Sequence, residues 1–229
     1  MEGAPHESTP GKIEISPEYR VAATLEERQA AHTLSDRVYE REELKPQKED
    51  QDEDHYPFEK WIMSPATRVF TASIEGELVA TIAVVKDSEI GLPMDELYKE
   101  ELQTYRDQGD RLCEVSQYAV DADRVEQDIR EGKISARNLP GPHLLEVVLQ
   151  YVLRESIDRL FIVCRPTHAN FYRSMGLIPI GEEKYYSKVN NVAVPLMLDV
   201  RTLTGEGKES LPRRMRALLG ANIPDDLLA

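Results

Sequence analysis

The stretch Leu112-Cys113-Glu114-Val115-Ser116-Gln117-Tyr118-Ala119-Val120 decides the fold. Its apolar residues predict a strand in the core of the domain. A second stretch, Asn170-Phe171-Tyr172-Arg173-Ser174-Met175-Gly176-Leu177, predicts a short helix that ends at its glycine. The elements around these two stretches determine the kind of sheet to which the strand belongs.

Strands and helices alternate along the rest of the chain. Thr24 and Glu27 form a capping-box pattern, which predicts a helix that begins there and runs to about residue 43. Glu75-Gly76 predicts a hairpin turn between two strands. The other elements expected are strands at 19–23, 68–74, 78–85, 160–164, 183–187 and 194–200, helices at 94–108, from 143 onward and at 169–175, and a polar segment at 121–140. This order predicts a mixed α/β domain.

Length and composition fit one domain with tails. The 229 residues, 41% of them apolar, can bury one substantial core. We expect a flexible tail at 1–17, the domain at 18–203 and a C-terminal tail at 204–229, in which LPRRMRALL fits a terminal helix. The N-terminal residues contain no apolar stretch, and no run reaches the roughly 18 apolar residues that a membrane span requires. We therefore expect a cytoplasmic protein without a membrane span.

Charge and cysteine content argue against several kinds of site. The formal net charge of -14 argues against nucleic acid as a partner, because phosphate binding needs a dominant basic surface. Cys113 and Cys164 each lie within an apolar run, which favours buried, inert thiols over a disulfide or a nucleophile. No metal site is predicted.

Both quoted stretches resemble an acyltransferase superfamily. In residues 170–177, the tyrosine four residues before a glycine resembles the signature of N-acetyltransferase-like (GNAT) domains, with Leu177 in place of the usual phenylalanine. Residues 112–120 resemble the Glu-x-Ser-Arg-Phe strand of acyl-homoserine-lactone synthases, and the block 79–120 is still more similar to the N-acyl amino acid synthases. The resemblance implies a GNAT-like mixed central β-sheet flanked by helices, with a V-shaped opening between central strands. It also implies an N-acyltransferase that joins a long-chain acyl thioester to the amine of an amino acid or a similar small amine.

The sequence departs from these relatives at two points that bear on the substrates. Gln117 stands where the homoserine-lactone synthases have arginine, which argues against their sulfonium substrate. After Val120 no Gln/Arg-x-x-Gly-x-Gly/Ala loop follows that could hold coenzyme A pyrophosphate on its backbone N–H groups, and Asp121 and Asp123 would repel phosphates. The absence of this phosphate-binding loop is consistent with an acyl carrier protein as donor, which the resemblance to the N-acyl amino acid synthases implies. An acyl-phosphopantetheine thioester is then the co-substrate, and no permanently bound cofactor is expected.

Amide formation from a thioester needs a base for the amine, donors for the oxyanion and an acid for the thiolate. The resemblance assigns the acid to Tyr172, and packing beside Phe171 is its alternative role. Glu114 is the candidate base, provided that burial raises its pKa, and its alternative role is to order the sheet or a substrate-binding arginine. Backbone N–H groups of the acyl-thioester strand, residues Val115, Ser116, Gln117 and Tyr118, are the candidate oxyanion donors.

Three further sets of residues are candidates for contacts with substrates and partners. Surface solvation is the alternative for the substrate-binding arginines and for the lid, and a structural role is the alternative for His168. An amino acid carboxylate calls for a fork-shaped cation, which favours arginine. The candidates for this substrate are Arg37, Arg41, Arg68, Arg165 and His168. The candidates for a lid in the acidic loop 45–64 are Tyr56, Phe58 and Trp61. The candidates for a dock for the acidic carrier protein are Arg124, Arg130, Lys133 and Arg137, or Arg213, Arg214 and Arg216.

Two other functions remain open at this point. The first is a coenzyme A-dependent N-acetyltransferase, which the missing phosphate loop argues against. The second is an acyl-binding sensor without catalytic activity, which would retain a lipid but form no amide.

Overall fold

One mixed sheet organises the molecule. The computed structural model describes residues 14–44, 58–204 and 209–228. Its eight-stranded sheet has the order β1-β2-β3-β4-β5-β8-β6, with β7 paired to β8, and within it only the pairing of β4 with β5 is parallel. The strands are β1 (Glu18–Val21), β2 (Thr67–Ile74), β3 (Glu77–Lys86), β4 (Leu112–Val120), β5 (Arg159–Cys164), β6 (Ile178–Pro179), β7 (Lys184–Tyr186) and β8 (Asn191–Asp199). The predicted mixed α/β fold is confirmed.

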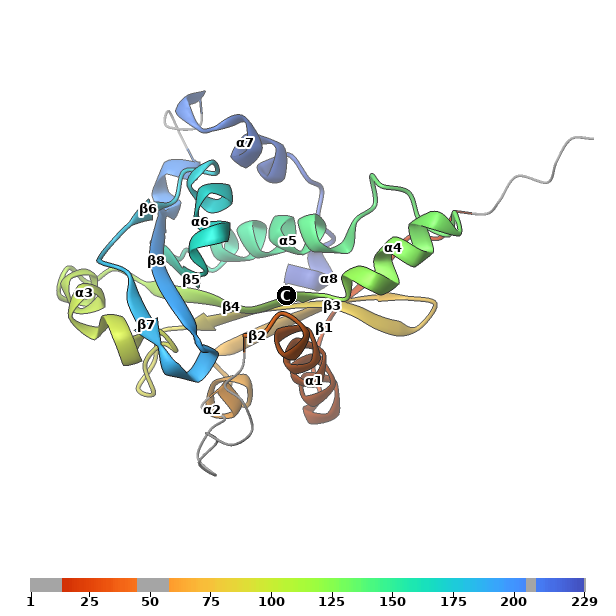
Figure 1. Ribbon diagram of the computed structural model, residues 1–229. Coiled ribbons are helices and arrows are strands. Elements are labelled where there is room, and N and C mark those ends of the chain that lie inside the picture. Colours follow the sequence, from red (N-terminus) through yellow and green to blue (C-terminus); the bar gives the residue numbers. More distant parts are fainter. Residues whose placement is uncertain (1–13, 45–57, 205–208, 229) are drawn as a thin grey trace, which may run out of the picture.

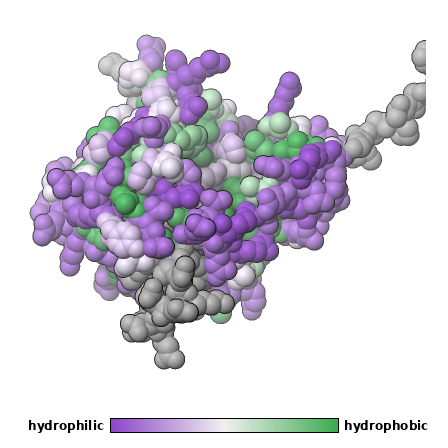
Figure 2. Space-filling model, viewed as in Figure 1, coloured by the Kyte–Doolittle hydropathy of each residue, from purple (hydrophilic) through white to green (hydrophobic). Residues whose placement is uncertain are grey.

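Helices cover both faces of the sheet (Figure 1). In that view α1 and α2 lie below the sheet, and α5, α6 and α7 lie above it. The helices are α1 (Leu25–Arg41), α2 (Phe58–Ile62), α3 (Asp95–Asp107), α4 (Ala122–Arg130), α5 (Pro140–Arg154), α6 (Pro166–Arg173), α7 (Arg213–Leu219) and α8 (Asp225–Leu228). Most of the surface seen from the same side is hydrophilic, with small apolar patches between charged residues (Figure 2).

Local signals fix α1 against the sheet. The predicted capping box is present, with the Thr24 Oγ1 accepting from the Glu27 N–H at 3.2 Å and the Glu27 carboxylate accepting from the Thr24 N–H at 2.9 Å. Arg28, one turn later, donates to the carbonyl oxygens of Ile62 at 2.7 Å and Thr67 at 3.2 Å. These contacts join the start of α1 to α2 and to the start of β2.

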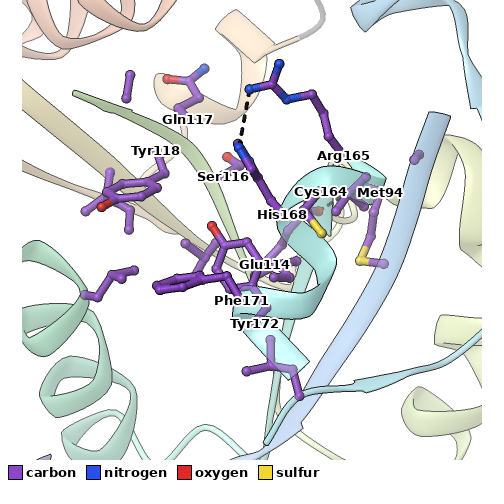
Figure 3. Close-up of a pocket in the computed structure, with 18 of the residues that line it drawn as sticks. Met94, Glu114, Ser116, Gln117, Tyr118, Cys164, Arg165, His168, Phe171 and Tyr172 are labelled. Atoms are coloured by element: carbon purple, nitrogen blue, oxygen red, sulfur yellow. Dashed lines mark hydrogen bonds between the residues drawn. The ribbon is translucent and has the colours of Figure 1, made fainter. Parts of the chain in front are cut away.

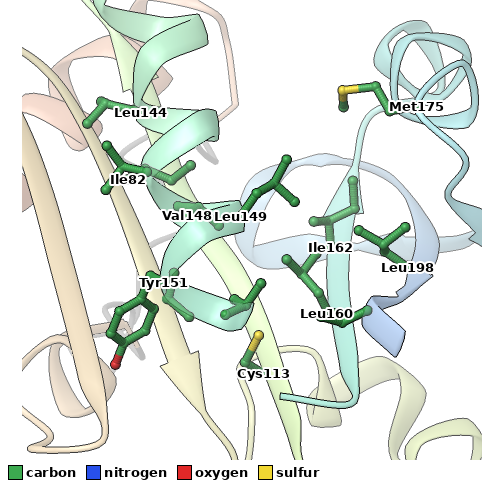
Figure 4. Close-up of a cluster of buried hydrophobic side chains, with 14 of the residues drawn as sticks. Ile82, Cys113, Leu144, Val148, Leu149, Tyr151, Leu160, Ile162, Met175 and Leu198 are labelled. Carbon is green, nitrogen blue, oxygen red and sulfur yellow. The ribbon is translucent and has the colours of Figure 1, made fainter. Parts of the chain in front are cut away.

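The main core lies between the sheet and α5. Leu144, Val148 and Val152 form one row of α5 and are all buried. Figure 4 shows Val148 and Leu149 on one side of this cluster and Leu160, Ile162 and Leu198 of the sheet on the other. As the periodicity of α5 predicts, the helix buries a wide face.

The sheet opens at its centre. Pairing between β4 and β5 ends at Val115 and Ile162, although both strands continue. On the other side of β4, Ala83 of β3 pairs with Ser116 and Thr81 pairs with Ala119. Two residues of β4, Gln117 and Tyr118, therefore lie opposite the single residue of β3 between Thr81 and Ala83. This is a β-bulge, and Gln117 within it has a positive φ of 51°, in the left-handed region that one type of bulge uses. The Ser35 hydroxyl of α1 donates to the Gln117 carbonyl at 3.2 Å and holds the bulge.

The segment expected to be polar contains a helix. Residues 122–130 form α4, whose cap is Asp121. Its apolar side chain Val125 packs with Ile74 and Val79 of the hairpin and with Ile134. Val125 and Ile129 lie one helical turn apart on its apolar side, but a helix of nine residues is not stable alone, and α4 depends on a docking site formed largely by residues far away in the sequence.

The C-terminal segment packs on the domain. Met215 of α7 and Leu227 of α8 are buried against the main core, and both helices contact α5. The helical expectation for 211–219 agrees with α7, but the segment is part of the packed molecule and not a loose tail. Across the described ranges, no helix combines the length and the apolar character needed to span a bilayer.

Candidate active site

A cavity of about 530 Å³ occupies the opening between β4 and β5 (Figure 3). All four residues of the predicted acyl-thioester strand, Val115 to Tyr118, line it, as do Glu114 and Tyr172. Beyond Val115 the edge of β4 that faces β5 has no strand partner in the described sheet. Its backbone groups can therefore donate hydrogen bonds to an oxygen atom placed in the cavity.

On the α5 side of the sheet, the cavity is apolar. We call this part the apolar compartment. Its walls are Leu145, Val148, Leu149, Leu160, Ile162, Met175, Leu177, Leu198, Met215 and Leu218. These residues come from α5, β5, the segment after α6, β8 and α7, and most belong to the main core cluster. A hydrocarbon tail is the kind of group that such walls accept.

On the opposite side of the sheet, the cavity is lined partly by α3 and β8. We call this part the Glu114 compartment, with walls that include Pro93, Met94, Leu97, Glu114, Tyr186, Val189, Asn191 and Ala193. Most of the apolar members belong to a second core cluster built around α3. The cavity thus joins spaces on both faces of the sheet through the opening between β4 and β5.

Glu114 is a buried carboxylic acid at the start of the opening. Only 4% of its surface is exposed, and its Oε2 accepts the Met94 N–H at 2.7 Å. Burial raises the pKa of Glu114 to about 8, the nearby negative charges of Asp95 and Glu96 act in the same direction, and the Met94 hydrogen bond opposes them. Such a group can accept and release a proton close to neutral pH.

Tyr172 lies on α6 and lines the cavity. Its ring packs edge-on against Phe171 at 5.2 Å, so the packing role and the cavity position coexist. Burial, with smaller contributions from Tyr118, Cys164 and Tyr39, raises the pKa of Tyr172 above its usual value, which keeps the phenol protonated. Within the described ranges its hydroxyl has no hydrogen-bond partner. It can therefore donate to a substrate atom.

The two cysteines are free thiols in different surroundings. Cys113 is fully buried in the core, whereas Cys164 is half-buried and lines the cavity, which differs from the expected full burial. Burial raises the pKa of the Cys164 thiol to about 11, so this group is protonated at neutral pH and a weak nucleophile.

Of the four arginines predicted for substrate binding, only Arg165 lines the cavity. Arg37 donates to Asp121 at 2.8 Å and Arg41 donates to Asp123 at 2.7 Å, both on the surface of α1. Arg68 lies over the ring of Tyr151, with its guanidinium carbon 5.8 Å from the ring centre. These contacts lie outside the cavity walls, so the structure does not bring Arg37, Arg41 or Arg68 to the site.

The guanidinium of Arg165 has an N–H group without a hydrogen-bond partner among the described residues. Its Nη2 donates to Glu42 at 3.1 Å and lies 3.4 Å from the His168 Nε2, a contact drawn as a dashed line in Figure 3. Its Nε is buried and, among the described residues, has no hydrogen-bond partner. His168 also lines the cavity, and burial together with the charge of Arg165 lowers its pKa. A neutral imidazole beside a cation with a free donor is suited to an anionic substrate group.

The lid prediction is wrong for Trp61. Its side chain is only 2% exposed, and its indole N–H donates to the Gly91 carbonyl at 2.9 Å. Trp61 therefore belongs to the core around α3, because that core offers an apolar site and a partly buried acceptor. Phe58 begins α2, and Tyr56 lies outside the described residues.

The two predicted docking clusters differ in how far their charges are neutralised. Arg124 and Lys133 are surrounded by acidic partners, among them Glu75 and Asp128, while Arg130 and Arg137 are exposed. The exposed arginines of the second cluster, Arg213, Arg214 and Arg216, have no acidic partner among the described residues. Arg214 instead donates to the Ser174 hydroxyl at 2.9 Å and lies over the ring of Phe171, which lines the cavity.

Sequence reasoning missed several residues of the site. Tyr186 lines the Glu114 compartment and donates its hydroxyl to Glu96 at 2.6 Å, and Tyr39 and Met94 line the cavity as well. No sequence motif marks these residues, because their segments come together only in the folded chain. No group of three or more potential metal-ligating side chains is found in the ranges that the structure describes.

The profile of the N-acyl amino acid synthase FeeM family matches residues 30–199 of the chain. The chain is similar to the structure of FeeM, an N-acyl amino acid synthase from uncultured soil microbes, with a TM-score of 0.72 and 30% identity over 82% of this chain and 93% of that chain. An agmatine N-acetyltransferase is similar in fold, with a TM-score of 0.56 and 15% identity over 80% of this chain and 99% of that chain. So is BjaI, a coenzyme A-dependent acyl-homoserine lactone synthase, with a TM-score of 0.52 and 14% identity over 89% and 87% of the two chains. No curated protein sequence matches the chain.

The raised pKa of Glu114 predicts a specific effect of pH on stability. In the unfolded chain its pKa is about 4.3, so the folded state holds the proton more tightly. This contribution is fully present below about pH 4.3 and is lost as the pH rises through about 8. Relative to Glu114→Gln, which cannot ionise, the wild type should lose free energy of unfolding over that range. Urea unfolding measured at steps of pH tests this.

The exposed Glu100 provides the control for the change in net charge. Glu100→Gln should follow the pH dependence of the wild type. Parallel stability curves for Glu114→Gln and the wild type would show that the carboxyl at residue 114 has an ordinary pKa.

Proposed function

The chain belongs to the N-acyl amino acid synthase family, and from this premise we propose that it joins a long-chain acyl group, delivered by acyl carrier protein, to the amine of an amino acid. It is an N-acyltransferase with a GNAT-like fold. The observation that carries the finer proposal is the cavity that crosses the sheet. A tail in the apolar compartment and an amine in the Glu114 compartment would meet at the opening beside Val115.

In the proposed reaction the amine nitrogen attacks the thioester carbonyl carbon. Glu114, acting through a water molecule, accepts the proton that the ammonium must lose, and its raised pKa brings it closer to that of an amine. Free N–H groups on the edge of β4 stabilise the oxyanion. The carbon–sulfur bond then breaks, and the Tyr172 hydroxyl protonates the departing thiolate. The second proton that the nitrogen loses returns to the Tyr172 oxygen through water, and an amide and a thiol leave the site.

Arg165 is the proposed partner of the acceptor's carboxylate. It lines the cavity, its Nε has no hydrogen-bond partner in the part of the chain that the structure describes, and its guanidinium contacts Glu42 and His168. A carboxylate can take two parallel hydrogen bonds from such a fork. This position favours an amino acid over an amine without a carboxylate.

The shape of α5 supports a carrier protein over coenzyme A as donor. Two residues of its first turn, Pro140 and Pro142, have no N–H group. Between them, a Cβ atom added to Gly141 would lie 2.6 Å from the Tyr118 hydroxyl oxygen, so the space above this turn is already filled. A pyrophosphate would find few free donors there.

The α7 cluster is the proposed dock for the carrier. Arg213, Arg214 and Arg216 are exposed on the helix whose other residues Met215 and Leu218 line the apolar compartment. A local positive surface resolves the conflict between an acidic partner and a chain with a net charge of -14.

A direct assay tests the proposed function. The purified protein is incubated with amino acids and either a long-chain acyl carrier thioester, the same acyl group on coenzyme A, or acetyl-coenzyme A. We expect mass spectrometry to detect an N-acyl amino acid, formed fastest from the carrier thioester. The rate at low carrier concentration should fall as salt rises to about 0.5 M. Preference for acetyl-coenzyme A would indicate an N-acetyltransferase, and a retained lipid without amide product would indicate a sensor.

Two conservative substitutions test the catalytic roles. Glu114→Gln keeps an acceptor for the Met94 N–H but cannot take a proton, so turnover should fall at least about tenfold and its rise towards pH 8 should disappear. Tyr172→Phe keeps the packing with Phe171 but removes the proposed acid, so turnover should also fall. Steady-state kinetics and circular dichroism measure activity and folding together. Normal turnover in a folded variant would contradict the role of that residue.

Arg165→Lys tests the carboxylate subsite. It keeps the charge but loses the fork, so the KM for the amino acid should rise about tenfold with little change in kcat. The KM for the acyl donor should stay the same. Arg41→Lys, in a surface ion pair on α1, is the matched control and should behave as wild type. If Arg165→Lys raised the KM for amines without a carboxylate by the same factor, Arg165 would have a role other than binding the carboxylate.

A further inference from the structure

The helix α7 is fastened to the domain at several points. Arg214 donates to the Ser174 hydroxyl after α6 at 2.9 Å, and the Gln150 side chain of α5 donates to the Leu219 carbonyl at 3.2 Å. Pro212, which caps α7, packs over Gly176 and lies 3.6 Å from the position that a Cβ atom would take there. The position of α7 is therefore set by both of the helices that flank the apolar compartment.

One side of α7 completes the wall of the apolar compartment. Met215 is 1% exposed and Leu218 is half-buried, and both line the cavity, as Leu149 of α5 also does. The three arginines and Ala217 are exposed, and Leu219 is half-buried and packs against the main core. Without α7 this side of the compartment would be open to solvent at the place where Met215 now lies.

The segment that carries this wall lies outside the residues that the family profile matches. The family profile matches residues 30–199, whereas α7 begins at Arg213. The catalytic strand, α5 and α6 belong to the matched part, so the reaction chemistry and the far wall of the cavity come from different parts of the chain. A substitution on α7 can therefore change the size of the compartment without touching Glu114, Tyr172 or Arg165.

We infer that α7 sets the length of the acyl tail that this protein accepts, with Met215 as the residue against which the end of the tail stops. The inference rests on the proposed function, since it places the acyl group of the thioester in the apolar compartment. Each methylene that fits in the compartment contributes about fourfold to binding, and a methylene that does not fit is excluded. The position of the Met215 side chain therefore determines the tail length above which a further methylene no longer fits.

Substitution of Met215 provides the test. Met215→Ala removes most of the side chain and should shift the preferred donor to tails longer by about two carbons. Met215→Trp fills more of the compartment and should shift the preference to shorter tails by a similar amount. The readout is the distribution of N-acyl products that forms when thioesters of graded tail length compete in one reaction. Leu218→Ala and Leu218→Phe, at a half-buried position that tolerates change more easily, should give the same pair of shifts.

Leu227→Ala on α8 is the matched control. Leu227 is buried against the same core but does not line the cavity, so its substitution should lower stability and leave the product distribution unchanged.

A binding series measures the tail length that the compartment accepts without catalysis. Its readout is the thermal stabilisation of each variant by free fatty acids of graded length. If the wild type forms amides and both Met215 variants keep its tail preference in products and in binding, the inference is overturned while the proposed function stands. If no variant forms an amide, the proposed function fails, and the binding series alone decides whether Met215 limits the tail.

Discussion

The separation of β4 from β5 after Val115 is the constraint on which the site depends. Two parallel strands that pair over their whole length leave no space between them and no free backbone groups. Here the bulge at Gln117 adds a residue to β4 and bends it away, and the Ser35 hydroxyl of α1 binds the carbonyl group that the bulge exposes. The cavity, the free edge of β4 and the connection between the two faces of the sheet all follow from this local departure from regular pairing.

The surroundings of Glu114 oppose ionisation. A carboxyl group that served only to stabilise the sheet would be better placed beside a cation, or replaced by an apolar residue of similar size. Glu114 instead receives one backbone hydrogen bond and lies near two further acidic residues, Asp95 and Glu96. A buried acid in a cavity, with its pKa moved towards neutrality, is the arrangement expected of a group that exchanges protons during a reaction.

Sequence patterns predicted the elements that local signals determine. The bounds of β4 agree residue for residue, and the capping box of α1 and the row of apolar residues on α5 are as expected, because a short stretch contains each signal. The helix α4 and the burial of Trp61 were not predicted, since both depend on partners far away in the chain.

For the same reason the sequence could not show that Arg165 lines the cavity while Arg37 and Arg41 do not. Asp121 and Asp123, some eighty residues later, bind the latter two. The cavity walls come from six or more segments, and no motif records their meeting.

The passage through the sheet has a consequence for the end of the reaction. In the proposed reaction the thiol formed from the donor could withdraw along the edge of β4, whereas the new amide would have its head on one face of the sheet and its tail on the other. The amide would leave only after its tail had been pulled out of its apolar surroundings, and each methylene would slow that step by about fourfold. For long tails, product release would then limit the turnover rate more than bond formation. An acceptor for the emerging tail, such as a micelle or a membrane surface, would speed the cycle without taking part in the chemistry.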